Sequence, residues 1–206
     1  VLYRKNPQFD LVTTGKIEQG RLTFQDQHLK RLRESARYFA YPFDEEKLKV
    51  ELNQTLAELD PSTDYRLRIS IAKSGKATCQ LEKLQALPEA FCRAILVPQN
   101  ANLQQPFTYF KTSYRPHLSL GQQEQIYYNA QGQLLESSIG NLVLQLDGHL
   151  YTPPVELGLL NGIYRQHLLA TGQVTEKILS LDDLKSAERI YACNTLRGLY
   201  ELEIDD

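Results

Sequence analysis

Short apolar runs separated by tight turns constrain the fold most strongly, and they gather in residues 134–152. The run LLESS is followed by NLVLQL, and an Asp-Gly pair at 147–148 then leads into HLYT. Such runs around an Asp-Gly turn are typical of antiparallel hairpins. A proline-bounded loop precedes a helix predicted over 162–170, which ends before Gly172. The C-terminal half is therefore expected to be rich in hairpins.

The N-terminal half predicts a mixture of strands and helices. Two short strands are expected within residues 10–24, and a helix over 25–39 follows, with an apolar stripe beside a polar one. Asp44 is expected to cap a second helix over 45–59, which precedes a strand over 64–72. Further strands are predicted in the segments ATCQLEKL, AFCRAILV, FTYFK, EQIYYN, RIYAC and GLYELEI. Strands with a few scattered helices predict an α+β fold.

One polar stretch indicates how the 206 residues are divided. The sequence QNANLQQP at 99–106 has the composition of a linker between domains. We therefore expect a smaller N-terminal α+β domain over residues 1–98 and a larger, strand-rich C-terminal domain over residues 99–206.

The composition excludes several classes of protein. A formal net charge of −2 gives no general attraction to nucleic acid or to an anionic membrane. No apolar run approaches the about 20 residues that a membrane-spanning helix needs. The three cysteines are widely spaced and form no CxxC pair, so neither a disulfide nor a metal site is expected, and a cytoplasmic protein fits. Methionine is absent, so we expect that the sequence begins inside the natural gene product.

The helix start at Gly162 is the first candidate for chemistry. Asn161 is expected at the N-cap, with Gly162 and Ile163 in the first helical turn. The backbone N–H groups of that turn have no partner within the helix, and with the helix dipole they form a site suited to a phosphate. An ordinary helix start, with a glycine for tight packing, explains the same residues.

Three charged side chains are further candidates. Lys111 follows the aromatic run FTYF, and an amine held against apolar walls loses hydration and becomes a usable nucleophile or proton carrier. Glu136 has apolar neighbours, and a protonated heteroaromatic nitrogen would offset the cost of its burial. Arg31 lies with His28 and Ser35 on the polar stripe of the first predicted helix and could reach an anion. Each of the three could equally be a solvent-exposed side chain.

Several sequence blocks, taken in order, resemble the class IV aminotransferase family. They are HLKRLRESARYF, FKTSYR, GQLLESSIGNLVLQLDGHLYTPPVELGLLNGIYRQHLL and DDLKSAERIYACNTLRGL. The resemblance runs from about Phe9 to the C-terminus and is closest to the aminodeoxychorismate lyase branch. It implies an enzyme of fold type IV, like the D-amino acid aminotransferases, with pyridoxal 5'-phosphate (PLP) between its two domains. It also implies a homodimer that acts on a small-molecule amine.

The resemblance assigns roles to three residues near the reacting atoms. Lys111, in FKTSYR, corresponds to the lysine that binds the cofactor covalently through its aldehyde. Glu136, in LLESSIGN, corresponds to the acid that holds the ring nitrogen. Thr14, in LVTTGK, falls where the lyases have a threonine near the reacting carbon.

Four more residues correspond to the family's phosphate site. Gly162 and Ile163 in LNGIYR, together with Thr195 in CNTLRG, correspond to the phosphate cup. Arg31, in HLKRL, corresponds to the arginine on that phosphate. The acid and the helix start would therefore hold the two ends of one cofactor.

The chain departs from the family pattern without losing any of these residues. It begins almost at LVTTGK, where the family has one or two earlier strands. The segment between FKTSYR and EQIYYN is shorter than the family's usual helix, and the family's "SN" appears as Gly140-Asn141.

Three functions are compatible with the sequence. In an aminodeoxychorismate lyase, Lys111 would remove a ring proton and the enolpyruvyl group would leave as pyruvate, giving 4-aminobenzoate for folate synthesis. In a transaminase for branched-chain or D-amino acids, Arg115 or Arg197 would bind a substrate carboxylate. A catalytically silent paralogue would serve as a binding module.

Overall fold

The computed structural model describes residues 7–99, 106–119, 121 and 123–205. Two compact units divide the chain: Val1–Gln85 with Phe110–Arg115, and Ala86–Tyr109 with Pro116–Asp206. The sequence predicts a boundary between residues 98 and 99, whereas the structure has it between Gln85 and Ala86. The reason is that the strand ending at Pro98 pairs within the sheet of the second unit. Most of the predicted linker, at 100–105, lies outside the described residues.

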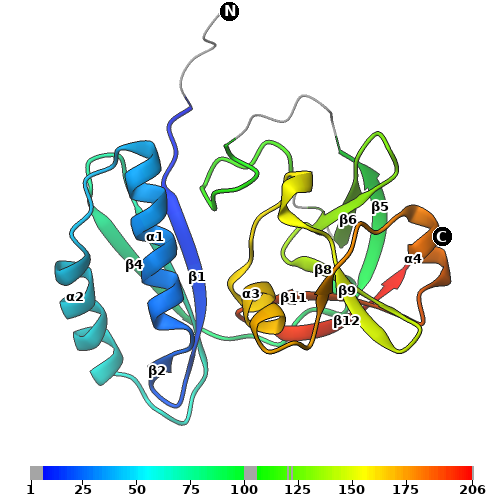
Figure 1. Ribbon diagram of the computed structural model, residues 1–206. Helices are drawn as coiled ribbons and strands as arrows, with labels where there is room; N and C mark the ends of the chain where they lie inside the picture. The colour runs from blue at the N-terminus through cyan, green and yellow to red at the C-terminus, as the bar shows by residue number, and fades with distance from the viewer. Residues whose placement is uncertain (1–6, 100–105, 120, 122, 206) are drawn as a thin grey trace, which may run out of the picture. The chain divides into compact units, whose positions relative to one another are not determined.

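A four-stranded antiparallel sheet with two helices forms the first unit (Figure 1). The strand order is β2-β1-β3-β4. Alternate residues of β3 are buried, as expected for a strand with one face on a core. The strands are β1 (Leu11–Glu18), β2 (Arg21–Leu22), β3 (Tyr65–Ile71) and β4 (Ala77–Lys83).

Both helices of this unit contribute apolar residues to one core with the sheet. α1 (Gln25–Phe39) has the bounds that the sequence predicts, and α2 (Glu45–Ala57) ends slightly earlier than predicted. The Asp44 carboxylate accepts a hydrogen bond from the Lys47 N–H at 2.9 Å, so the predicted N-cap is confirmed. The core includes Leu11, Ile17, Leu29, Leu32, Leu48, Leu52, Leu67, Ile69 and Ile71.

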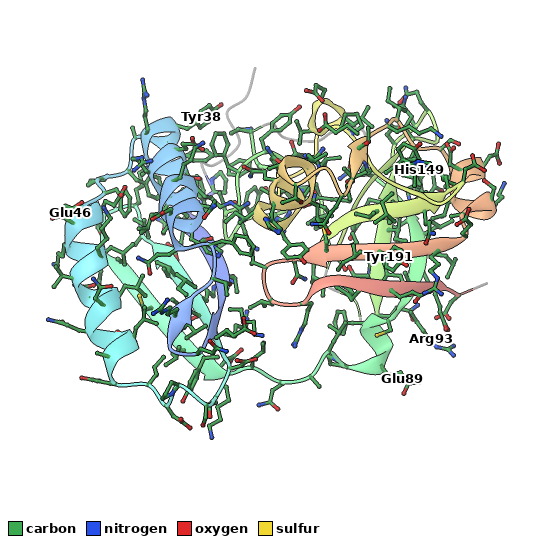
Figure 2. All side chains as sticks on the ribbon, turned by 60° about the horizontal axis from the view of Figure 1, so that its bottom comes forward. Tyr38, Glu46, Glu89, Arg93, His149 and Tyr191 are labelled. Atoms are coloured by element: carbon green, nitrogen blue, oxygen red, sulfur yellow. The ribbon has the colours of Figure 1, made fainter. Side chains whose placement is uncertain are left out.

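The predicted strand FTYFK is wrong. The Tyr109 N–H donates to the Pro106 carbonyl at 2.9 Å, so the chain turns there instead of extending. An isolated bridge between Leu11 and Thr112 follows. The aromatic run suggested a strand, but Phe110 stacks on Tyr38 of α1, a residue labelled in Figure 2, with ring centroids 4.4 Å apart.

An eight-stranded sheet dominates the second unit, in the order β10-β9-β8-β11-β12-β5-β6-β7. β7 also pairs with β8, and this pairing closes the strands between them into a barrel. The strands are β5 (Arg93–Pro98), β6 (Glu124–Tyr128), β7 (Leu134–Ser137), β8 (Asn141–Leu146), β9 (His149–Thr152), β10 (Thr175–Glu176), β11 (Arg189–Asn194) and β12 (Gly198–Ile204). The core includes Ala94, Ile126, Leu134, Leu142, Leu144, Ala192 and Leu202.

Short helices complete the second unit. α3 (Ile163–Ala170) lies beside β11 in Figure 1, and α4 (Leu181–Ser186) follows β10 along the chain. Two single-turn helices, η1 (Glu89–Phe91) and η2 (Val155–Leu157), lie in connecting segments. Strands and helices occur together in both units, so the predicted α+β class is confirmed.

The turn chemistry of the second unit follows the sequence. Asp147 and Gly148 have positive φ angles of 50° and 74° between β8 and β9, as the predicted Asp-Gly hairpin turn requires. Gly172, with φ of 69°, follows the cap residue of α3. Within the described ranges, no helix is long and apolar enough to cross a lipid bilayer.

Candidate active site

Lys111 lies on a backbone segment that is joined to β1 in the first unit. The Lys111 carbonyl accepts a hydrogen bond from the Val12 N–H at 2.9 Å. Two residues further along β1, Thr14 is 7% exposed and pairs with Arg68 of β3. The backbone of Lys111 is therefore held next to the strand that carries Thr14, within the first unit.

His28 is a buried residue of this region that the sequence analysis did not place in the site. Its side chain is on α1, is fully buried, and has Nδ1 2.6 Å from the Thr13 hydroxyl. Burial, followed by the positive charges of Arg31 and Lys111, lowers the pKa of His28 to about 3. The imidazole is therefore neutral at physiological pH. Its place on the polar stripe with Arg31 was the available signal.

Arg31 and Arg115 interact electrostatically in the first unit. Burial and the positive charge of Arg115 lower the pKa of the Arg31 guanidinium to about 10, so Arg31 is still charged at neutral pH. Two nearby guanidinium groups repel each other, and a bound anion would relieve that repulsion. The structure thus brings together one residue predicted for the phosphate and one predicted for a substrate carboxylate.

Glu136 is buried in the second unit, on β7 of the barrel. All four residues of β7 are buried, and Glu136 is 2% exposed. Its Oε1 accepts a hydrogen bond from the Leu160 N–H at 3.4 Å, and the His117 Nε2 lies 3.9 Å from the same oxygen. The alternative of a solvent-facing carboxylate is therefore wrong. A carboxylate in this position needs positive or hydrogen-bonding partners.

Glu136 is linked to the start of α3 by a hydrogen bond to Leu160, which lies in the loop before that helix. The Asn141 side chain, opposite Glu136 in the β7–β8 pair, donates to the Leu160 carbonyl at 2.7 Å. The Asn141 Oδ1 occupies the space beside Gly162, since a Cβ atom there would lie 1.9 Å from it. Only glycine fits this approach. Glu136 and Gly162 are therefore coupled through Leu160 and Asn141.

The N-terminus of α3 is built as the sequence predicts, with one correction. Gly162, not Asn161, is the N-cap residue, and it makes no side-chain capping bond. Asn161 instead accepts a hydrogen bond at its Oδ1 from the Arg165 guanidinium at 3.1 Å. The N–H groups of the first turn, beginning with Ile163, consequently lack a side-chain cap and suit an anion.

Thr195 lies in a turn that is close to this helix start. The Asn194 Oδ1 fixes the turn by accepting from the Leu196 and Arg197 N–H groups at 2.9 and 3.0 Å. A Cβ atom at Gly198, the end of the turn, would lie 3.2 Å from the Tyr164 hydroxyl of α3. The turn that carries Thr195 and Arg197 thus lies against the first turn of α3.

A second buried acid in the barrel was missed by the sequence analysis. Glu124 on β6 is fully buried, and burial raises the pKa of its carboxyl group. Its Oε1 accepts from the Ser138 hydroxyl at 2.6 Å and from the Ile139 N–H at 3.0 Å. Ser138 and Ile139 lie between β7 and β8. Glu124 therefore braces the turn that joins Glu136 to Asn141. Its position in an apolar, aromatic strand gave little sign of this role.

The predicted site residues are divided between the two units. Lys111, Thr14, Arg31 and Arg115 belong to the first, and Glu136, Gly162, Ile163, Thr195 and Arg197 belong to the second. The buried acid fits a cationic ring nitrogen, and the uncapped helix start fits a phosphate. In the part of the chain that is described, no group of three or more His, Cys, Asp or Glu side chains could hold a metal ion.

Comparison with known proteins identifies the family. The model of the amino-transferase class IV family matches residues 10–202. The chain belongs to the class IV aminotransferase family. It is therefore a PLP-dependent enzyme, as the family's members are, and the predicted resemblance and cofactor are confirmed.

Individual relatives carry names from two reaction classes. A Schizosaccharomyces pombe protein named "Putative aminodeoxychorismate lyase" is 27% identical over 195 residues, covering 88% of this chain and 84% of the relative. A crystal structure of a "Putative amino-acid aminotransferase" from Mesorhizobium loti is 32% identical, with a TM-score of 0.82, covering 96% of this chain and 100% of that one.

A third relative establishes the fold type. A fold IV transaminase from Curtobacterium pusillum has a TM-score of 0.77 at 15% identity, covering 95% of this chain and 76% of that one. Fold type IV, predicted from the sequence, is therefore confirmed.

Proposed function

We propose that this class IV enzyme is a lyase that converts 4-amino-4-deoxychorismate to 4-aminobenzoate and pyruvate, in the cytoplasm and as a homodimer. The observation that supports this reaction over others is the relative named as an aminodeoxychorismate lyase, whose match spans 88% of the chain. The place of the reaction in folate biosynthesis follows from its product.

The proposed cofactor site uses the residues that the resemblance to the family assigns to PLP. Lys111 would bind the aldehyde carbon and Glu136 the ring nitrogen. Arg31 would bind the phosphate together with the phosphate cup of Gly162, Ile163 and Thr195. When bound, PLP withdraws electrons from carbon atoms conjugated with the substrate amine, and this makes a substrate proton acidic.

Glu136 would keep the ring nitrogen protonated because a buried carboxylate favours a cation beside it. The two residues before it on β7, Leu134 and Leu135, are apolar and are 0% and 1% exposed. A charge-assisted hydrogen bond in such surroundings is stronger than in water. Full activity in Glu136→Ala would contradict this role.

Lys111 would act as the base that moves the substrate proton. Its amine would take the ring proton of the bound substrate while the bond between the ring carbon and the enolpyruvyl oxygen breaks. The leaving oxygen would take up a proton, and the released enolpyruvate would tautomerise to pyruvate. Thr14, buried on β1, would lie near the reacting carbon of the substrate. Arg115 and Arg197 would bind substrate carboxylates, since guanidinium groups pair with them through two hydrogen bonds.

Transamination of a branched-chain or D-amino acid is the second candidate. The relative from Mesorhizobium loti, which is 32% identical, carries an aminotransferase name. In that reaction Arg115 or Arg197 would bind the substrate carboxylate. A silent binding module is not favoured, because these relatives are named as enzymes.

Product analysis separates the two enzymes. The purified protein, loaded with PLP, is incubated with 4-amino-4-deoxychorismate in the absence of any 2-oxo acid. Pyruvate release supports the lyase, whereas glutamate formed from 2-oxoglutarate and an amino acid supports the transaminase. Lys111→Ala is the control, and it should fold normally while losing the covalent attachment of cofactor that borohydride fixes in the natural protein.

A further inference from the structure

His117 lies between FKTSYR and EQIYYN, in the segment that is shorter than the usual helix of the family. The structure buries it in the second unit: its side chain is 1% exposed, and that of Glu136 is 3% exposed. The His117 Nε2 lies 3.9 Å from the Glu136 Oε1. A polar ring is thus placed beside the acid that the family resemblance assigns to the cofactor.

Two groups approach the same oxygen of the Glu136 carboxylate. The Leu160 N–H donates to Oε1 at 3.4 Å, and the His117 Nε2 faces Oε1. At 3.9 Å the His117 contact is longer than a hydrogen bond, and it is an ion pair when the imidazole is protonated. Buried surroundings strengthen such a contact, because little water is present to screen it.

We propose that His117 is a positioning residue for Glu136. Together with the Leu160 N–H it attracts Oε1, and this directs Oε2 towards the ring nitrogen of PLP. The inference rests on the proposed role of Glu136, and it adds a residue that holds the acid in its working orientation. Residues that orient a binding group commonly affect affinity without touching the ligand themselves.

Because the Nε2 atom of His117 is the one near Glu136, a substitution that keeps a polar atom at that position can test the role. A glutamine side chain can place its amide near the position of Nε2, whereas an asparagine amide reaches only the position of Nδ1. His117→Gln should therefore retain the function, and His117→Asn should lose it. Both substitutions introduce the same polar group, so a merely structural role would not separate them.

Cofactor binding gives the readout. The dissociation constants of PLP and of its 1-deaza analogue, in which carbon replaces the ring nitrogen, are measured by equilibrium dialysis on cofactor-free protein. In the natural protein PLP should bind more tightly than the analogue. We expect His117→Asn to lower this preference by about tenfold. His117→Gln should keep most of it, and binding of the analogue should be unchanged in both.

The outcomes separate this inference from the proposed function. If Glu136→Gln abolishes the preference for PLP while His117→Asn keeps it, the inference is wrong and the role of Glu136 stands. If Glu136→Gln also keeps the preference, the proposed role of Glu136 fails. A stronger preference in His117→Asn would mean that His117 competes with the ring nitrogen, and would overturn the inference. His149→Gln is the matched control, since His149 is exposed at the β8–β9 turn (Figure 2).

Discussion

Asn141 and Gly162 pack so closely that a Cβ atom at position 162 would lie 1.9 Å from the Asn141 Oδ1. Asn141 has little freedom to move away, because it is buried and its Nδ2 donates to the Leu160 carbonyl at 2.7 Å. Leu160 in turn contacts the Glu136 carboxylate through its N–H. A substitution at Gly162 is therefore expected to alter the position of the Glu136 carboxylate.

Gly162→Ala should displace Asn141 and weaken cofactor binding. We expect a loss of stability of about 1–3 kcal/mol, typical of overpacking, measured by urea unfolding followed by circular dichroism. The affinity for PLP should fall as well. In Asn141→Ala/Gly162→Ala the clash is absent, so the two substitutions should be less harmful together than the sum of their separate effects. Strict additivity would contradict the contact.

His28 should make the protein more stable at neutral than at acidic pH. Its pKa is about 3 when folded, below the ordinary value of 6.5, so the unfolded chain binds a proton that the folded one does not. The free energy of unfolding is therefore highest at pH values above the ordinary pKa of 6.5, and it decreases as the pH falls towards the folded-state pKa of about 3. The free energy of unfolding of His28→Asn, measured at about pH 7.5 and about pH 4.5, should fall less on acidification than that of the natural protein. An equal fall would contradict this assignment.

Arg31→Gln should weaken PLP binding. A charge-assisted hydrogen bond to a phosphate contributes about 1.5–3 kcal/mol, which corresponds to a loss of affinity of about 10- to 100-fold. Arg33→Gln is the control, because Arg33 lies on the same helix, pairs with Glu45, and has a side chain that is 58% exposed. If both variants bind PLP equally well, Arg31 does not contact the phosphate.

Glu124→Ala should destabilise the barrel more than Glu124→Gln. The alanine variant leaves the Ser138 hydroxyl and the Ile139 N–H without their buried acceptor, at a cost of about 1–3 kcal/mol for each donor left unsatisfied. Glutamine keeps an acceptor oxygen and should restore much of the loss. The control is Glu188→Ala, which removes an acceptor for the Gly148 N–H at an exposed turn and should have a small effect on thermal unfolding.

Local chemistry made most elements predictable. α1 and the Asp-Gly hairpin follow from helical periodicity and from turn residues, which act within a few positions of each other. The strand FTYFK failed for the opposite reason, because the packing of Phe110 on Tyr38 depends on a distant helix. Apolar periodicity does not record such contacts.

Some of the candidate site residues can be recognised by residue type alone. Glu136 and Gly162 stand out as an acid among apolar residues and a glycine before a helix. His117 and Glu124 do not, because what places them near Glu136 and the turn after it is the pairing of β6 with β7 and the fold of the segment before β6. The N-cap at Asn161 was wrong for a related reason: the Asn161 side chain pairs with Arg165 instead.

Closure of the barrel also limits how two copies could associate. β7 has β6 on one side and β8 on the other, so it offers no unpaired backbone edge. At the other end of the sheet order, within the residues described, stands β10, which has two residues. Intermolecular strand addition to this sheet therefore has little backbone to use, and a dimer built on the second unit would depend on contacts between side chains.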